Sequence, residues 1–414
     1  MKNKKVVIIG AGVSGLVAGI NLEKAGFEPI IYDRNNRVGG RVQTDYIDGH
    51  TFDKGFQILL PNYPAAKKYL NIQLLHLKYF APGAFVFKDG YHGKLGNPGK
   101  DFDLLFSTLF SKLATFSDKL KIVKLYRKVK YKSFDEIFKT ESKTTLNYLK
   151  SFGFSNHVID NFFKPFYAGV FLEENLDTSS RMFEFTFKLF AETKAGIPEK
   201  GIQAIPNQLA NQLKKTTFHF NTSIKSVEDD FLVLSNDKTV KYDFAIIATE
   251  PSSLISNLNN QQSEWKSVDN LYFEVENRVI NLPMIGLISD HESFINNLHY
   301  LTLASKSTQI ISVSIVKSHH LSQQELIEKV QEELEEICHI KVKRFLKHYK
   351  IPKALPNILD VNYQIPHTET KLKDRIFLAG DVLSNGSLNA AMLNGESAAK
   401  AVIEHANGLT LDMA

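Results

Sequence analysis

The stretch Val6-Val7-Ile8-Ile9-Gly10-Ala11-Gly12-Val13-Ser14-Gly15 lies near the start of a chain of 414 residues. Its first four residues are β-branched and predict a buried strand, and apolar residues with helical spacing over positions 16–22 predict a helix that ends at Gly26. Residues 29–32 predict a second strand, which ends at Asp33. This order of strand, glycine turn, helix, strand and acid predicts a dinucleotide-binding unit.

Each glycine of the turn has its own physical role. Gly10 permits a tight turn, Gly12 lets the backbone approach a pyrophosphate, and Gly15 lets the helix pack closely on the strand. Val13 and Ser14 begin the helix, so N–H groups and the positive end of the helix dipole face the phosphates there. The turn is therefore expected to bind phosphate groups.

Two residues after the second strand bear on the nucleotide. Asp33 is spaced to accept a hydrogen bond from a ribose hydroxyl group. The adjacent Arg34 would favour a 2′-phosphate, which Asp33 would repel. The fingerprint alone leaves FAD and NAD open.

A second glycine pair follows, in Arg37-Val38-Gly39-Gly40-Arg41. Gly39 and Gly40 let backbone N–H groups point at phosphate oxygens, and Arg41 adds a charge-assisted bond. This stretch resembles the second phosphate-binding motif of the superfamily of flavin-containing amine oxidases, phytoene desaturases and protoporphyrinogen oxidases. The resemblance implies that the cofactor is FAD.

Three further segments extend the resemblance. The first is Gly55-Phe56-Gln57, which resembles the turn beside the flavin ring. In the second, the main chain near Ile224 would meet the adenine. In the third, a strand at 375–379 ends in Gly380-Asp381, and Asp381 would bond the ribityl or pyrophosphate region.

The C-terminal segment continues into a helix that starts at Ser387-Leu388-Asn389-Ala390. By the resemblance, the N-terminus of this helix points at the pyrimidine edge of the flavin, where reduced flavin carries negative charge. The sequence departs from the family at Ala390, where Gly is frequent, and at Asn394, where Ser is frequent. These departures bear on the placement of the ring.

The resemblance implies an α/β fold with two domains. We expect a discontinuous, Rossmann-like FAD-binding domain of the GR2 type at residues 1–61, 196–262 and 360–414. An α+β substrate domain is expected at residues 62–195 and 263–359, with helical patterns dominating its first part, including helices at 155–164 and 180–190.

Phenylalanines concentrate in the first part of the expected substrate domain, between residues 162 and 190. Two interpretations stay open: these side chains line a cavity for a small hydrophobic or aromatic substrate, or they pack as an ordinary helix core.

Residues 111–132 form a basic stretch with interleaved apolar residues and only Asp118 opposing it. It predicts either a helix that touches a membrane surface or a solvated helix face. Its basic residues are Lys112, Lys119, Lys121, Lys124, Arg127, Lys128, Lys130 and Lys132. The formal net charge of the whole chain is only +5, so we expect no nucleic-acid partner.

The location of the protein follows from two features of the chain. Its single cysteine, Cys338, fits a reducing compartment, and we interpret the glycine-rich start as a strand and turn rather than a secretory signal. We therefore expect a cytoplasmic protein, with peripheral membrane contact left open.

The expected chemistry comes from the cofactor, because FAD in this superfamily accepts a hydride at N5. No metal site or nucleophilic triad is expected, catalytic residues stay unassigned, and His319-His320 is interpreted as a surface pair. Residues 349–356 lack the aromatic pattern of amine oxidases, which favours dehydrogenation of a hydrophobic substrate. Amine oxidation, isomerisation and a non-catalytic flavoprotein are the alternatives.

Overall fold

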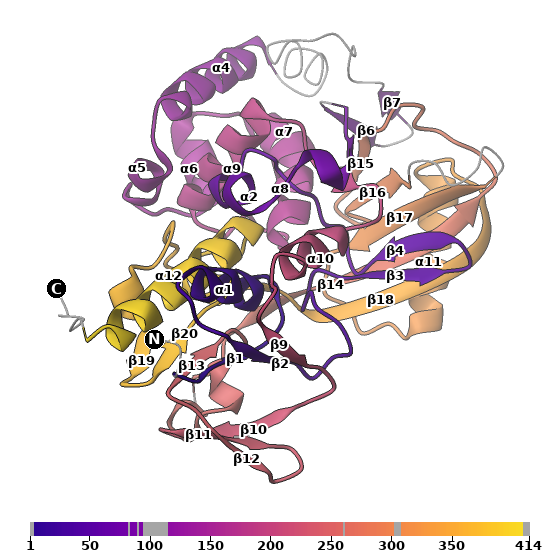
Figure 1. Ribbon diagram of the computed structural model, residues 1–414. Coiled ribbons are helices and arrows are strands. Elements are labelled where there is room, and N and C mark those ends of the chain that lie inside the picture. The colour runs from indigo at the N-terminus through magenta and orange to yellow at the C-terminus, as the bar shows by residue number, and fades with distance from the viewer. Residues whose placement is uncertain are drawn as a thin grey trace.

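The computed structural model describes residues 4–81, 83–88, 91–93, 115–259, 261–301 and 308–408. Two large β-sheets and a group of helices make up most of this part (Figure 1). Both sheets combine strands from distant stretches of the chain, so long-range pairing sets the architecture.

The first sheet has six strands in the order β19-β20-β13-β1-β2-β9. All neighbouring strands run parallel except the edge pair β19–β20. The strands are β1 (Val6–Ile9), β2 (Ile30–Tyr32), β9 (Thr217–His219), β13 (Phe244–Ile247), β19 (Lys371–Lys373) and β20 (Ile376–Leu378). A mainly parallel sheet joined through helices confirms the predicted α/β class.

Both faces of this sheet are covered, as the alternation along β1 shows. Val6 and Ile8 pack in one core with α1 (Val13–Lys24) and α12 (Leu388–Ala406), whereas Val7 and Ile9 pack against a β-meander. Figure 1 shows the two helices on one side of the sheet and the meander on the other. The meander consists of β10 (Ile224–Val227), β11 (Phe231–Leu234) and β12 (Thr239–Lys241).

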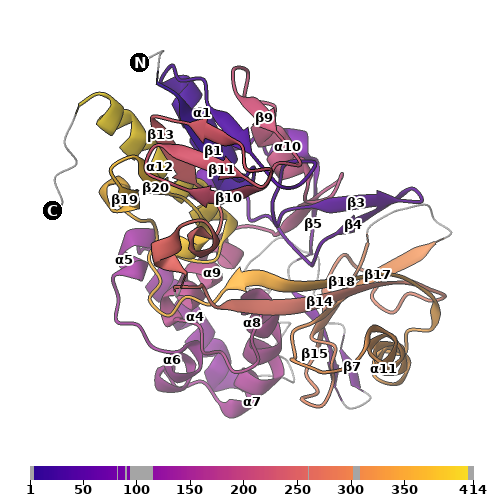
Figure 2. The ribbon, with the colours of Figure 1, turned by 90° about the horizontal axis from the view of Figure 1, so that it is seen from below.

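The second sheet has seven strands in the order β18-β14-β17-β16-β15-β6-β7, antiparallel except for the β15–β6 pair. Its two longest strands, β14 and β18, run side by side (Figure 2). The strands are β6 (Ala84–Lys88), β7 (Tyr91–Gly93), β14 (Trp265–Val275), β15 (Ile285–Ile288), β16 (Asn297–Tyr300), β17 (Gln309–Ile315) and β18 (Val342–Pro356). The sequence patterns did not predict β6 and β7.

One face of the second sheet packs against α11 (Gln323–Glu336). Leu271 and Phe273 of β14 share a core with Leu326 of this helix. The hydroxyl group of Ser322 accepts the N–H of Glu325 at 3.3 Å, so this serine caps the helix.

Most other helices form a separate group beside the two sheets (Figure 1). They are α4 (Phe116–Lys130), α5 (Phe134–Phe138), α6 (Thr145–Phe152), α7 (Asn156–Val158), α8 (Lys164–Phe171) and α9 (Ser180–Glu192). The other two helices contact the helices of the six-stranded sheet: α2 (Pro64–Tyr69) contacts α12 and α10 (Ala204–Ala210) contacts α1. Lys112 and Leu113 of the basic stretch lie outside the described residues.

The helix predicted over residues 155–164 is wrong in its extent. Ser155 caps it as expected, but α7 ends at Val158 and a π-helical turn, Ile159–Phe163, leads directly into α8. Pro165 lies in the first turn of α8, where its missing N–H leaves no intrahelical bond unmade. The cap of α9 is Ser179, one residue before the start that the pattern indicated.

The phenylalanine-rich segment forms a helix core. Phe163 and Phe183 are fully buried, and their ring centroids lie 6.0 Å apart. Tyr167 lies 4.8 Å from Phe183 and extends the cluster. Phe162, Phe171, Phe185 and Phe187 are buried as well. The interpretation as an ordinary core is therefore correct for most of these rings.

Short elements complete the described chain. Two small sheets pair β3 (Thr44–Ile47) with β4 (His50–Asp53) and β5 (Leu77–Tyr79) with β8 (Gly196–Pro198). The 3-10 helices are Gln73–Leu75, Pro251–Ser253, Ser256–Leu258, His367–Thr370 and Asp381–Leu383. The domain boundaries given above stay predictions.

Candidate functional site

The glycine turn after β1 is shaped by contacts that exclude side chains. Gly10 has φ +108°, and a Cβ there would lie 2.9 Å from the carbonyl oxygen of Ala248 at the end of β13. A Cβ on Gly15 would lie 2.0 Å from the carbonyl oxygen of Gly10. The predicted tight turn and the close packing of helix on strand are thus both present.

Gly12 behaves differently, because it borders open space. The nearest atom to a Cβ on Gly12 is Cα of Gly40, 4.0 Å away. The N–H of Gly39 donates to the carbonyl oxygen of Ala11 at 2.9 Å and holds the two glycine turns together. The two predicted phosphate-binding turns therefore lie side by side, and they are in contact, since a Cβ on Gly40 would lie 3.3 Å from the Cα atom of Gly12.

The start of α1 faces this space with its backbone. Its N-cap is Gly12, which has no side chain to cap the first N–H groups, so the positive end of the helix is left for a ligand. Val13 and Ser14 are both buried, and the Ser14 hydroxyl group donates to the carbonyl oxygen of Ala391 at 2.7 Å. The side chain of Ser14 thus ties α1 to α12, and only its backbone is free to serve a phosphate.

Asp33 lies buried at the end of β2. One carboxylate oxygen accepts the N–H of Ala11 at 2.7 Å and the other accepts the N–H of Asn35 at 2.8 Å. A carboxylate has about four acceptor positions, so capacity remains for a ribose hydroxyl group. Arg34 is exposed beside it.

The meander begins next to Asp33. The N–H of Thr222 donates to the carbonyl oxygen of Asp33 at 2.9 Å. Ile224, which starts β10, follows two residues later. The main chain predicted to meet the adenine therefore lies near the ribose end of the expected nucleotide.

Arg41 and Asp381 form an ion pair, although 340 positions separate them in the chain. Asp381 is buried, and Arg41 also donates to the carbonyl oxygen of Ala354 at 3.2 Å. The guanidinium carbon lies 5.1 Å from the centroid of the Trp265 ring. The sequence predicted that both charged residues bind the cofactor. It predicted neither their pairing nor the contact of Arg41 with Trp265.

The start of α12 is capped as predicted. The Ser387 hydroxyl group accepts the N–H of Ala390 at 3.0 Å, and Asn389 accepts the N–H of Ala65 at 3.1 Å. Leu388, the first residue of the helix, is half-buried. The buried Asn394 donates to the carbonyl oxygen of Gly380 at 2.8 Å. This bond gives the departure at Asn394 a structural role, since it ties the helix to the loop that carries Asp381.

Gly55, Phe56 and Gln57 lie where the two sheets approach each other. Gly55 has φ +87°, and a Cβ there would lie 3.0 Å from the Cδ1 atom of Ile351 in β18. The Gln57 amide donates to the carbonyl oxygen of Arg41 at 3.0 Å. This turn is therefore joined to the second phosphate-binding turn on one side and to the seven-stranded sheet on the other.

Phe56 contacts a histidine that no sequence pattern indicated. The rings of Phe56 and His299 lie 4.3 Å apart between centroids, and Phe80 contacts both of them edge-on. His299 is 4% exposed, and burial lowers its pKa to about 3. The imidazole is therefore neutral at physiological pH.

His299 belongs to a buried polar group on the face of the seven-stranded sheet opposite α11. Strand register forms two rows of neighbours across β16, β17 and β14. We call these six residues the inner face: His299, Ser312, Tyr272, Asn297, Ser314 and Asn270.

All six side chains of the inner face are uncharged at neutral pH, and each residue is at most 4% exposed. Asn270 joins the two rows, since it bonds Ser312 at 3.1 Å and Ser314 at 3.1 Å. Two buried atoms, Nδ1 of His299 and Oδ1 of Asn297, have no hydrogen-bond partner among the described residues. Such atoms are costly to bury and favour a polar ligand atom or water beside them.

The histidine pair at 319–320 only partly meets the expectation. His320 is exposed, but the side chain of His319 is 7% exposed and its Nε2 lies 3.4 Å from a carboxylate oxygen of Asp269. The other carboxylate oxygen lies 2.5 Å from Nε2 of His348. The surface interpretation is wrong for His319, because the fold brings Asp269 of β14 alongside it.

Neither a metal site nor a membrane-spanning helix is found among the described residues. No group of three or more histidine, cysteine, aspartate or glutamate side chains there is arranged to hold a metal ion. Across the same residues, no helix has both the length and the apolar character to cross a bilayer.

Comparison with known proteins identifies the family. A family described as flavin containing amine oxidoreductase matches residues 13–403. A 4,4'-diaponeurosporene oxygenase of Staphylococcus haemolyticus is 43% identical over 63 residues, which is 15% of this chain and 12% of that protein. A phytoene desaturase of Fusarium fujikuroi is 46% identical over 57 residues, 14% of this chain and 10% of that protein. These matches therefore span only about a tenth of the curated relatives.

Solved structures share the fold over nearly the whole chain. A putative protoporphyrinogen oxidase from Exiguobacterium has a TM-score of 0.67 and 17% identity, with 97% of this chain and 99% of that chain covered. A putrescine oxidase bound to putrescine has a TM-score of 0.72, 17% identity and the same coverage. A fatty acid isomerase from P. acnes has a TM-score of 0.74 and 16% identity, again with 97% and 99% covered. At this identity the likeness establishes the fold.

The geometry fits the cofactor that the family uses. The open surroundings of a Cβ on Gly12, the uncapped start of α1 and the spare acceptor capacity of Asp33 suit the phosphates and ribose of FAD. The individual residue assignments stay predictions. From the matched residues 13–403, the chain belongs to the flavin containing amine oxidoreductase family.

Proposed function

We propose that this enzyme dehydrogenates a hydrophobic, uncharged organic substrate, in the manner of a desaturase or a protoporphyrinogen oxidase. The observation that carries the proposal is the uncharged character of the inner face and of the aromatic rings beside it. FAD supplies hydride acceptance at N5, and the protein binds and orients both reactants.

The residues of the six-stranded sheet would hold the cofactor. Gly12 leaves room for the pyrophosphate, and Asp33 accepts a ribose hydroxyl group. The N-terminus of α12 directs its dipole toward the pyrimidine edge. These roles concern cofactor binding alone; the dehydrogenated substrate gives a hydride to FAD and releases a proton, and no side chain is assigned as acceptor of that proton.

The substrate side favours a neutral molecule. An ammonium group is stabilised by a carboxylate or by desolvated aromatic faces. Asp53 adjoins the inner face, since its backbone carbonyl oxygen accepts the Tyr272 hydroxyl group at 2.7 Å. Its carboxylate already accepts the Thr44 hydroxyl group and the N–H of Ile202, and burial raises its pKa to about 6. Asp53 is therefore poorly suited to bind a cation.

The test is anaerobic mixing of the purified yellow enzyme with representatives of three substrate classes. Bleaching of the flavin absorbance by a polyene or a porphyrinogen, without bleaching by amines, is the expected result. Bleaching by amines alone would contradict the proposal and indicate amine oxidation.

Two further outcomes separate the remaining alternatives. A shifted double bond in an unsaturated fatty acid, with no net bleaching, would indicate an isomerase. Absence of both bleaching and product with every class would indicate a non-catalytic flavoprotein. Either result would overturn the proposal. The variant His299→Phe changes the inner face at its contact with Phe56 and tests whether a productive substrate lies there.

A further inference from the structure

The helix α4 has two apolar faces on opposite sides. Ile122, Leu125 and Val129 recur at helical spacing and are buried in the main core. Phe116 and Leu120 recur on the other side and are 76% and 58% exposed. A helix at the surface of a soluble domain needs only the first of these faces.

The exposed face continues past the end of the helix. Val123 is 39% exposed and Tyr131, directly after the helix, is 81% exposed. We call Phe116, Leu120, Val123 and Tyr131 the apolar stripe. It holds four of the eight large hydrophobic side chains that are exposed in the described residues. Single exposed apolar residues are ordinary, whereas an aligned set indicates a surface that meets another phase or molecule.

Basic side chains flank this stripe on both sides. By helical geometry, Lys119 and Lys130 lie along one border, and Lys121 and Lys124 lie along the other. Arg127 lies within the stripe itself. None of these five side chains forms an ion pair with a described residue.

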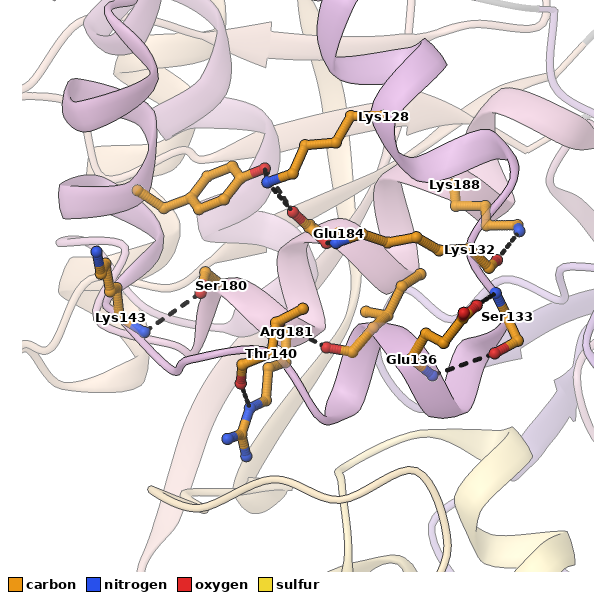
Figure 3. A network of polar contacts seen from close by, with 12 residues as sticks. Lys128, Lys132, Ser133, Glu136, Thr140, Lys143, Ser180, Arg181, Glu184 and Lys188 are labelled. Atoms are coloured by element: carbon orange, nitrogen blue, oxygen red, sulfur yellow. Dashed lines mark hydrogen bonds and ion pairs between the residues drawn. The ribbon is translucent and has the colours of Figure 1, made fainter.

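Two other lysines of the segment instead form ion pairs that hold α4 against α9. Lys128 and Lys132 each lie 2.9 Å from a carboxylate oxygen of Glu184 in α9 (Figure 3). Burial opposes ionisation of Glu184, but hydrogen bonds from Tyr148, Lys128 and Lys132 outweigh it and lower the pKa of this carboxyl group. The Lys188 side chain donates to the carbonyl oxygen of Lys130 at 2.9 Å and holds the C-terminal end of α4.

The other end of α4 is fixed as well. The Thr115 hydroxyl group accepts the N–H of Asp118, and a carboxylate oxygen of Asp118 accepts the N–H of Thr115 at 3.1 Å. The Ser155 N–H donates to Asp118 at 2.9 Å. Because both ends are anchored, the apolar stripe is held in one orientation, at the outer edge of the helical group (Figure 1).

We propose that the apolar stripe of α4 docks the enzyme on an anionic membrane surface, with the flanking cations against lipid headgroups. The apolar side chains would enter the boundary between headgroups and acyl chains, and the lysines would stay at phosphate level. Charge complementarity selects this occupant. A second copy of the chain would place five unpaired cations against the same five, which disfavours a symmetric dimer through this face.

The experiment is flotation of the FAD-loaded enzyme with vesicles of phosphatidylglycerol or of phosphatidylcholine. We expect binding to the anionic vesicles, weaker binding at high salt, and little binding to the zwitterionic vesicles. Leu120→Glu should weaken binding about tenfold, because it removes buried apolar area and adds a negative charge at the surface. Lys124→Glu should weaken it by a similar factor, about tenfold, through charge alone.

The matched control is Leu359→Glu, since Leu359 is 88% exposed and lies far from α4 in the chain. This variant should bind the vesicles like the unchanged enzyme. All variants should keep their flavin absorbance and melting temperature, because each changes only an exposed side chain. Absence of anionic-vesicle binding, equal loss in the Leu359 control, or a dimer in solution that Leu120→Glu dissociates would each overturn the proposal.

Discussion

The glycine turns at the edge of the six-stranded sheet and the inner face of the seven-stranded sheet meet around Phe56, but they are built in opposite ways. The turns depend on backbone conformations that a few consecutive residues specify, as at Gly10 and Gly12. The inner face depends on side chains from three strands, which become neighbours only through pairing. The predicted cofactor-binding turns are therefore encoded locally, whereas the inner face is encoded by topology.

The largest effect that tests this contrast is expected for Gly12→Val. The fold has room for the new side chain, since the nearest atom to a Cβ is 4.0 Å away, but the pyrophosphate would lose that space. The variant should fold and be colourless, as measured by circular dichroism and flavin absorbance.

Gly26→Ala is the matched control for the cofactor. Gly26 has φ +91° with no atom within 4 Å of a Cβ, so alanine should cost about 1 kcal/mol of stability and leave FAD content unchanged. If the Gly12→Val protein still binds a full complement of FAD, Gly12 does not lie at the phosphate site.

A smaller effect is expected for the ion pair that joins the two ends of the chain. Arg41→Met leaves the buried Asp381 without its partner and should weaken FAD binding by about 2 kcal/mol. Titration of the apoprotein with FAD measures this change. Asp381→Asn and the double variant complete a mutant cycle, and additive losses would show that the pair does not act as a unit.

The inner face should instead respond through pH. Burial lowers the pKa of His299 from 6.5 to about 3, so the unfolded chain gains a proton that the folded chain does not take up as pH falls between these values. Stability should therefore decrease toward acid by up to about 1.4 kcal/mol per pH unit, and His299→Phe should remove that dependence. FAD content should not change. Urea unfolding at several pH values gives the comparison, and identical slopes for both proteins would refute the assignment.

Asp53 should show an effect of the opposite sign, over a narrower pH interval than His299. Burial raises its pKa from 3.8 to about 6, although bonds from Thr44 and Ile202 oppose the shift. The folded chain then keeps a proton that the unfolded chain releases, so this residue lowers stability as pH rises from 3.8 to 6. Asp53→Asn should make the unfolding energy rise more steeply over that interval. A flatter profile in this variant would mean that Asp53 is ionised in the folded protein.

Whether a contact was predictable from the sequence depends on how far apart in the chain the interacting residues lie. The caps at Ser322 and Ser387 were predictable, because each serine bonds an N–H three residues along the chain. The extent of the helix over residues 155–164 was not, since a π-helical turn replaces part of it before Pro165. His319 was misplaced because its contact is Asp269, a residue of another strand.

By itself, the sequence determined the cofactor class and the turns that receive it. A positive φ at Gly10 or a helix that starts without a cap at Gly12 is a property of a few adjacent residues. Only the tertiary structure decided that Arg41 pairs with Asp381, that His299 lies against Phe56, and that the second apolar face of α4 stays uncovered by described residues. Those features arise from strand pairing and helix packing between distant segments, where local patterns carry no information about the partner.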